Sequence, residues 1–270
     1  MYSLSFAISL QETSFDAIQK LEKDFLLLLN LYGYRGVEFA IRDPEKVDLS
    51  ELTPLLERLN LQVSAIGTGQ AFVDEGLSLS SSDAEKRKGA IARLESHMKL
   101  SKELPGYPYI IVGLIRGRSE GDISKAMERL KASMLEVLDL AEKYDVNILL
   151  EPINRYETDL INTVPEAIRW IRDLGSKRLF LLADTFHMNI EERNIFEALR
   201  LAMGHHLLRY VHIADSNRWA PGYGHLDLER IVNELLKVGY EWWFSGEMLP
   251  KPSLEECVYR MVRELFWEES

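Results

Sequence analysis

The chain has 270 residues, of which 46% are hydrophobic and 28% are charged, a balance that excludes a disordered or fibrous protein. Acidic residues outnumber basic residues by 43 to 32, and the resulting net charge of −11 would repel the phosphate backbone of a nucleic acid. The single cysteine cannot form an internal disulfide, and no apolar run approaches the roughly 18 residues of a membrane span. We therefore expect a cytoplasmic protein with neither a nucleic acid nor a membrane as partner.

Short apolar runs alternate with longer helical patterns along the sequence. The helical pattern is clearest over residues 123–143, where apolar side chains recur every three or four positions, as on the buried face of a helix. Strands that alternate with helices are typical of βαβ units, which build a parallel sheet. The predicted strands, in chain order, are Tyr2–Ile8, Gly36–Ala40, Gln62–Ile66, Tyr109–Gly113, Asn147–Glu151, Leu179–Asp184, Tyr210–Ala214 and Trp243–Glu247.

These eight strands favour one domain over two. Length alone would allow two domains of about 150 residues each, but about 250 residues is also the usual size of a (β/α)8 barrel. No linker rich in glycine, serine or proline divides the chain. We predict an α/β fold, a single (β/α)8 TIM barrel over residues 1–270.

The last four predicted strands each run from apolar residues into a polar one. These polar residues recur at intervals close to the length of one βα unit. In a barrel the carboxyl ends of all strands open on the same face, where barrel enzymes do their chemistry. Four side chains are therefore expected to converge there: Glu151, Asp184, His212 and Glu247.

Such a group of side chains indicates a cation site. Three carboxylates and one imidazole would repel one another strongly without a cation between them. Hard oxygen donors with one nitrogen suit Mn²⁺, Mg²⁺ or Co²⁺ better than Zn²⁺. The alternative is that each is an ordinary polar residue where a strand leaves the sheet, but four of them at strand-like intervals favour the metal site.

Four segments of the sequence resemble the xylose isomerase-like barrel family and, within it, the ketose 3-epimerases of the tagatose and psicose type. They are EPINRYET at 151–158, ADTFHMN at 183–189, VHIADSNR at 211–218 and GE at 246–247. The phrases at 65–70, 184–191 and 214–221 are similar to those of the 5-keto-L-gluconate epimerases of myo-inositol breakdown. The resemblance spans nearly the whole chain.

The resemblance implies a role for each matching residue. It makes Glu151, Asp184, His212 and Glu247 the ligands of a divalent metal ion, with Mn²⁺ preferred and Mg²⁺, Co²⁺ or Zn²⁺ as alternatives. Glu151 and Glu247 would also form the acid/base pair. Contacts to the oxygens of a sugar or keto-sugar acid substrate would come from Glu157, His187 and Arg218. The family also implies a homo-oligomer, either a dimer or a tetramer.

The expected reaction inverts C3 of a ketose or keto-sugar acid, and the conversion of 5-keto-L-gluconate to D-tagaturonate is the named candidate. A proton next to a ketone can be removed at neutral pH if the enolate oxygen is stabilised, and a metal ion does this as a Lewis acid. Inversion then needs two carboxylates on opposite faces of the planar cis-enediolate. Glu151 and Glu247 fit these positions because they follow the fifth and the eighth strand.

A keto-sugar acid would also need a partner for its own carboxylate. Arginine binds carboxylates through two parallel hydrogen bonds, and Arg116, which follows the fourth strand, is the first candidate. Arg118, Arg155 and Arg218 lie in loops at the same face of the predicted barrel. Gln70, after the third strand, adds an amide there.

Three other functions stay open at this point. An aldose–ketose isomerase, acting on hydroxypyruvate or a pentose, would use the same metal and the same enediolate. An abasic-site endonuclease shares this type of barrel, but the chain has only six histidines for a site with several zinc ions, and its charge disfavours DNA. A catalytically silent sugar-binding barrel would keep the pocket without exchanging a proton.

Overall fold

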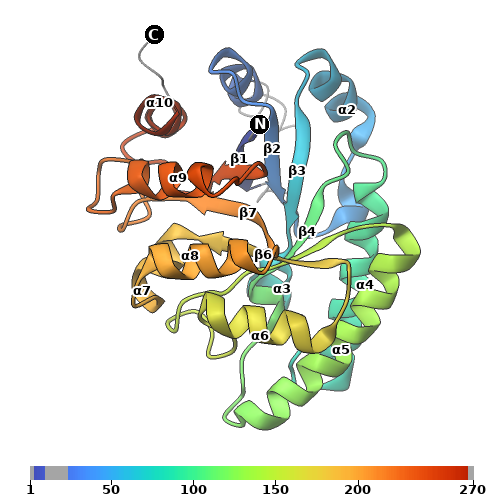
Figure 1. The fold of residues 1–270 in the computed structure, drawn as a ribbon. Coiled ribbons are helices and arrows are strands. Elements are labelled where there is room, and N and C mark those ends of the chain that lie inside the picture. The colour runs from blue at the N-terminus through green and yellow to red at the C-terminus, as the bar shows by residue number, and fades with distance from the viewer. Residues whose placement is uncertain (1–2, 10–23, 267–270) are drawn as a thin grey trace.

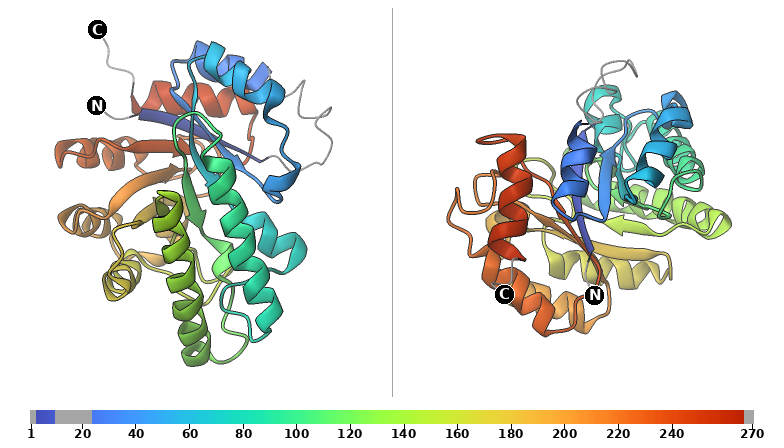
Figure 2. Two further views of the ribbon diagram at one scale, coloured as in Figure 1. Left: turned by 90° about the vertical axis from the view of Figure 1, so that its right-hand side faces the viewer. Right: turned by 90° about the horizontal axis from the view of Figure 1, so that it is seen from above.

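The strands of the protein close into a barrel. The computed structural model describes residues 3–9 and 24–266, and in these the parallel strands β1 to β8 pair in chain order, with β8 pairing back to β1. The helices surround this barrel (Figures 1 and 2). The predicted (β/α)8 fold is confirmed.

The observed strand bounds lie close to the predicted ones, and Tyr2 of the first predicted strand lies outside the described residues. Glu151 and Glu247 come directly after their strands. The strands are β1 (Ser3–Ser9), β2 (Gly36–Ala40), β3 (Gln62–Gly67), β4 (Tyr109–Val112), β5 (Ile148–Leu150), β6 (Leu179–Asp184), β7 (Leu208–Ile213) and β8 (Trp243–Gly246).

Helices follow the strands, and α4 and α5 lie side by side on the outside of the barrel (Figure 2, left). The helix predicted over 123–143 is α5, which begins after Asp122, whose side chain accepts a hydrogen bond from Lys125 N. None of the described helices is long and apolar enough to cross a lipid bilayer. The labelled helices are η1 (Pro44–Lys46), α2 (Leu49–Arg58), α3 (Gly69–Glu75), α4 (Ala84–Ser101), η2 (Leu114–Arg116), α5 (Ile123–Tyr144), α6 (Val164–Leu174), α7 (Thr185–Glu191), α8 (Ile195–Gly204), α9 (Leu228–Lys237) and α10 (Leu254–Leu265), and residues 24–31 are also helical.

Alternation along the strands decides which side chains enter the barrel. Leu149, Leu182 and Tyr210 belong to a small apolar cluster that is separate from the main core. Their strand neighbours, such as Leu150 and Leu181, belong instead to the main core, where the helices pack. Because successive side chains of a strand point to opposite faces, residues two positions beyond the members of the small cluster point the same way, toward the mouth of the barrel.

Candidate active site

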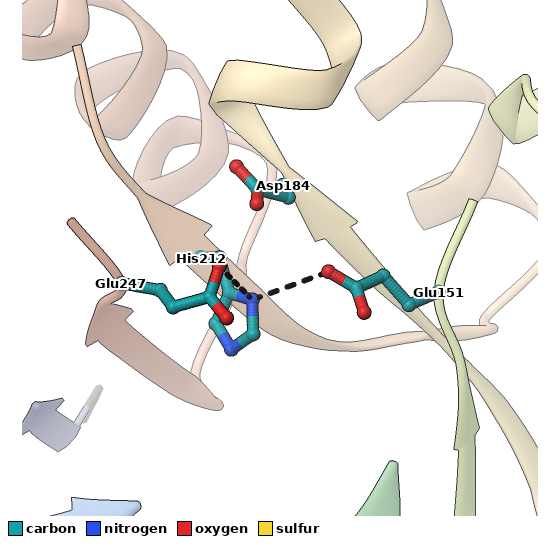
Figure 3. Close-up of side chains that lie close together, drawn as sticks. All are labelled: Glu151, Asp184, His212 and Glu247. Atoms are coloured by element: carbon teal, nitrogen blue, oxygen red, sulfur yellow. Dashed lines mark ion pairs between the residues drawn. The ribbon is translucent and has the colours of Figure 1, made fainter. Parts of the chain in front are cut away.

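The four predicted ligands come together at the carboxyl ends of β5, β6, β7 and β8. Each offers one ligand atom, and these atoms all lie within 4.8 Å of one another. Glu151 and Glu247 approach from opposite sides, with the His212 ring between them and Asp184 at the third side (Figure 3). His212 Nδ1 lies 3.5 Å from Glu151 Oε1 and 3.7 Å from Glu247 Oε2.

The strand register explains why these residues meet. Asp184 and His212 are paired neighbours on β6 and β7. Glu151 is two residues beyond Leu149, and His212 is two beyond Tyr210, so both follow the alternation that points into the barrel. The sequence pattern of apolar residues and one polar residue at the strand end is therefore sufficient to build the cluster.

The donor set fits a divalent metal ion. Asp184 Oδ2 and His212 Nδ1 are buried and have no hydrogen-bond partner among the described residues. Buried polar atoms without a partner are rare in folded proteins because each carries a desolvation cost. A cation between the four ligands would coordinate both atoms and offset the repulsion among the carboxylates.

The pKa values of the clustered side chains reflect this crowding. Burial raises the pKa of Asp184 to about 6, against the attraction of His187. Burial also opposes ionisation of Glu247, but Arg218 and His212 hold the pKa of that carboxyl well below its ordinary value. For His212, burial opposes a positive charge, yet Glu38 and Glu247 raise its pKa well above the ordinary value. Several neighbouring carboxylates thus interact with the same few positively charged groups.

A pocket of about 420 Å³ is lined by three of the predicted ligands, Glu151, His212 and Glu247, and it is large enough for a small sugar. Its lining combines these charged side chains with apolar residues, among them Ala7, Ala40, Val73 and Leu114. The predicted substrate contacts that line this pocket are Gln70, Glu157, His187 and Arg218.

Arg218 lies beside the predicted metal ligands. Its Nη2 donates to Glu247 Oε2 at 2.6 Å, and its Nη1 lies 3.8 Å from Glu157 Oε1. The guanidinium also lies over the ring of Phe186, 5.0 Å from the ring centroid. These negative neighbours raise the pKa of Arg218 above its ordinary value, against the effect of burial, so Arg218 brings a permanent positive charge to a floor of carboxylates.

His187 lies on α7, one turn beyond Asp184. Its Nε2 is 3.5 Å from Asp184 Oδ2 and 3.9 Å from Glu151 Oε1. Its Nδ1 faces away from the metal ligands, toward Asn154 Nδ2 at 2.8 Å and Glu157 Oε1 at 4.0 Å. The structure thus brings His187 and Glu157 together at one edge of the cluster.

The structure places Arg116 away from the pocket, contrary to the expected substrate contact. The side chain is 0% exposed, and its nitrogens donate to the carbonyl oxygens of Gly113, Glu151, Leu160 and Ile161. Burial lowers the pKa of this guanidinium to about 10. Arg116 points inward because it supplies hydrogen-bond donors to buried carbonyls of the segment that follows β5.

Two further candidate arginines are engaged elsewhere. Arg118 donates to the carbonyl oxygens of Tyr156 and Glu157, and Arg155 forms a bidentate pair with Glu191. Of the arginines considered for a substrate carboxylate, Arg218 is the one that lines the pocket formed by the described residues.

Sequence reasoning missed two residues that contact the site histidines. Glu38 lies in β2 and its Oε2 is 2.9 Å from His212 Nε2. The available signal was an acidic residue in the middle of the apolar strand Gly-Val-Glu-Phe-Ala. Asn154, which contacts His187, lies within the segment EPINRYET but was given no role because its partner is distant in sequence.

Comparisons with known proteins agree with this architecture. A family model described as a xylose isomerase-like TIM barrel matches residues 26–263. The L-ribulose 3-epimerase of Mesorhizobium japonicum is 33% identical over 228 residues, which cover 83% of this chain and 74% of the relative. The ketose 3-epimerase of Arthrobacter globiformis is 29% identical, with 77% of this chain and 71% of the relative covered. A solved structure of an L-ribulose 3-epimerase matches with a TM-score of 0.80 at 27% identity, and covers 100% of this chain and 89% of the other.

Proposed function

The chain belongs to the xylose isomerase-like TIM barrel family, and from its ligand cluster we propose that it is a metal-dependent epimerase that inverts C3 of a ketose or keto-sugar acid. It is an isomerase of the racemase and epimerase class that acts on carbohydrates. The observation that carries the proposal is the convergence of Glu151, Asp184, His212 and Glu247, three of which line a sugar-sized pocket. Mn²⁺ is the proposed ion, with Mg²⁺, Co²⁺ or Zn²⁺ as alternatives.

Each side chain has a defined task in this proposal. The ion, held by the four ligands, would act as a Lewis acid toward the substrate's carbonyl and hydroxyl oxygens. Glu151 and Glu247 approach from opposite sides (Figure 3), so one carboxylate removes the C3 proton and the other carboxyl returns a proton to the opposite face of the planar enediolate. The roles exchange in the reverse direction.

The remaining polar residues of the floor orient the substrate. Arg218 and His187 present N–H groups at the edge of the cluster, where they would donate to sugar hydroxyl or carbonyl oxygens. Glu157 would accept from a hydroxyl. Gln70 lines the wall of the same pocket and is proposed as a further contact.

The proposed substrate rests on two different supports. The names of the relatives point to ketoses, such as L-ribulose and D-psicose, whereas the sequence phrases at 65–70, 184–191 and 214–221 point to 5-keto-L-gluconate. The carbon that changes is the same in both, next to the carbonyl. We therefore propose 5-keto-L-gluconate first and neutral ketoses second.

Deuterium exchange tests the reaction. The protein loaded with Mn²⁺ is incubated in D₂O with 5-keto-L-gluconate, L-ribulose, D-psicose, D-tagatose or hydroxypyruvate, the metal is removed, and NMR locates the label. The proposal expects deuterium at the carbon next to the carbonyl that corresponds to C3 of a ketose. Label at C1 alone would identify an aldose–ketose isomerase, and no exchange with any divalent metal would identify a silent sugar-binding barrel.

Location and assembly belong to the same proposal. We propose a cytoplasmic homo-oligomer, a dimer or a tetramer, as the family resemblance implies. Light scattering after gel filtration tests the assembly, and a mass of 31.1 kDa, that of one chain, would contradict it.

A further inference from the structure

The site contains two buried imidazoles that present opposite ring nitrogens to the ligand cluster, His212 its Nδ1 and His187 its Nε2. His212 is to bind a metal ion through Nδ1, so this nitrogen must carry a lone pair. His187 faces Asp184 and Glu151 with Nε2, and it can donate to a substrate oxygen only if Nε2 carries a proton. A neutral imidazole has one donor and one acceptor nitrogen, and the partner of the outer nitrogen decides which is which.

Glu38 determines that Nε2 of His212 carries a proton. The Glu38 side chain is only 4% exposed, and Oε2 accepts a hydrogen bond from His212 Nε2 at 2.9 Å. The same oxygen accepts from Tyr210 Oη and from Ser245 Oγ, each also at 2.9 Å. An oxygen that receives three donors is an acceptor only, so His212 Nε2 must carry a proton, and Nδ1 is the nitrogen that can offer a lone pair to an ion.

The barrel interior holds Glu38 in this position. Tyr210 precedes His212 by two residues on the same face of β7, and Ser245 is the register partner of His212 on β8. Ser64 Oγ lies 2.7 Å from the Tyr210 hydroxyl and 2.6 Å from Ser5 Oγ. Five strands therefore contribute to one buried network that ends at the outer nitrogen of a metal ligand.

Asn154 determines which nitrogen of His187 carries the proton. Its Oδ1 accepts from Tyr156 N at 3.0 Å, which fixes the orientation of the amide. Its Nδ2 then donates to Glu157 Oε1 at 2.9 Å and to His187 Nδ1 at 2.8 Å. His187 Nδ1 is therefore an acceptor, and the proton lies on Nε2, which faces the pocket.

We propose that Glu38 and Asn154 are positioning residues that hold both histidines with a proton on Nε2, so that His212 turns a lone pair on Nδ1, and His187 turns its Nε2–H group, toward the cluster. Glu38 keeps His212 as a metal ligand through Nδ1, and Asn154 keeps His187 as a hydrogen-bond donor to the substrate through Nε2. The inference rests on the proposed function, because it assigns the two histidines to metal and substrate. Outer partners of this kind usually change metal affinity by about 10- to 100-fold when they are removed.

Metal affinity tests the role of Glu38 without any substrate. Titration calorimetry with Mn²⁺ compares the wild type with Glu38→Ala, and the dissociation constant is expected to rise by about 10- to 100-fold. Ser245→Ala and Tyr210→Phe, which each remove one donor to Glu38, should give smaller increases and report on the network if Glu38→Ala does not fold. The matched control is Ser133→Ala, which removes a buried hydroxyl that donates to Leu79 O. Unchanged Mn²⁺ affinity in all three network variants would overturn the assignment.

The tautomer of His187 can be observed directly. In ¹⁵N-labelled protein loaded with diamagnetic Mg²⁺, long-range ¹H–¹⁵N spectra are expected to show the proton on Nε2 of His187 and on Nε2 of His212. Asn154→Asp keeps the size of the side chain but replaces the donor with an acceptor, so it should move the His187 proton to Nδ1. Asn194→Asp, at the N-cap of α8, is the control, because aspartate caps helices as well as asparagine does.

Kinetics then separate positioning from folding. Asn154→Asp should lower kcat/KM by at least tenfold while leaving the Mn²⁺ dissociation constant within about twofold, since the side-chain hydrogen bonds described for Asn154 go to Tyr156, Glu157 and His187 and to none of the four proposed metal ligands. A His187 proton that stays on Nε2 in Asn154→Asp would overturn the proposal for Asn154. Neither the ¹⁵N shifts nor the Mn²⁺ titration needs turnover, so failure of the proposed epimerase reaction would be distinguished from failure of this inference.

Discussion

The charge of the pocket floor depends on one arginine. Arg218 lies between Glu247 and Glu157, and its backbone takes φ +61°, in the left-handed region that an arginine rarely adopts. Two main-chain hydrogen bonds hold it there, from Arg218 N to Asp215 O and from Leu249 N to Arg218 O, both 2.7 Å. Strain of this kind persists where the surroundings fix a side chain for function.

Replacing Arg218 should therefore damage catalysis more than folding. Arg218→Met removes a donor to the substrate and the positive charge that keeps Glu247 ionised, so kcat/KM should fall by about 100- to 1000-fold. The control is Arg155→Met, whose exposed guanidinium pairs with Glu191 at the same face of the barrel; its kcat/KM should stay within about twofold. Steady-state kinetics measure both, and near-normal turnover by Arg218→Met would contradict its assigned role.

Among the elements, the loop between β7 and α9 is built around Asp215. This side chain is buried; its Oδ1 accepts from Ser216 N and Leu226 N, and its Oδ2 accepts from Gly222 N. The carboxylate thus satisfies three main-chain donors that the turn would otherwise leave unpaired. The loop carries Arg218, so its shape decides where the guanidinium lies.

Gly224 is a position where this loop has no space for a side chain. A Cβ there would lie 2.1 Å from Asp215 Oδ1, so in Gly224→Ala the loop or the carboxylate must move. We expect kcat/KM to fall by about 10- to 100-fold through misplacement of Arg218. Gly204→Ala is the control, because its Cβ would meet nothing within 4 Å. Equal kinetics for the two variants would show that the loop does not position Arg218.

Helix α4 provides a test of stability against pH. His97 is fully buried, with Nε2 2.7 Å from Ile41 O and Nδ1 2.8 Å from Arg93 O. Burial lowers the pKa of His97 from its ordinary value of 6.5 to about 4, against the effect of the two carbonyls. The unfolded chain therefore binds a proton first as the pH falls, so the stability that neutral His97 contributes is present above pH 6.5 and is lost between about pH 6.5 and 4.

Urea unfolding at pH 7 and pH 5 measures this contribution. The free energy of unfolding of the wild type should fall by about 2 kcal/mol more than that of His97→Gln between these two values. Circular dichroism follows the transition in both proteins. Parallel losses in wild type and variant would mean that His97 takes up its proton in the folded state as easily as in the unfolded chain.

At the scale of the whole molecule, the barrel is what makes most of the site predictable. Each ligand of the cluster lies at or next to the end of an apolar run, and parallel strands that close in chain order bring such ends to one face. The local sequence pattern and the length of the chain were enough to predict that these strand ends meet at one face of a barrel. The strand ends were correspondingly close to those expected, and Asp184 and His212 became paired neighbours.

Contacts across the barrel were not predictable in this way. Glu38 reaches His212 from β2, and the pairing depends on the tilt and register of the closed barrel rather than on any local pattern. Arg116 follows β4, where a residue is expected to line the mouth of the barrel. Its side chain instead points inward, because it donates to buried main-chain carbonyls. The direction of a side chain in a loop depends on which main-chain groups need it as a hydrogen-bond partner.

Metal binding should be visible in the stability of the whole barrel. An ion that binds the folded chain alone stabilises it by about 2.7 kcal/mol at a free concentration of 100 Kd. Calorimetric scans with Mn²⁺ and with EDTA should therefore give a higher Tm for the metal-loaded wild type. Asp184→Asn combined with His212→Ala should abolish this difference, and a double variant that responds to Mn²⁺ as the wild type does would place the ion elsewhere.

The most direct measurement is anomalous diffraction near the manganese absorption edge, from crystals of the protein grown with Mn²⁺. We predict one strong peak per chain, within bonding distance of Glu151, Asp184, His212 and Glu247. A map with no peak among these four side chains, or with its strongest peak bound by other residues, would contradict the account.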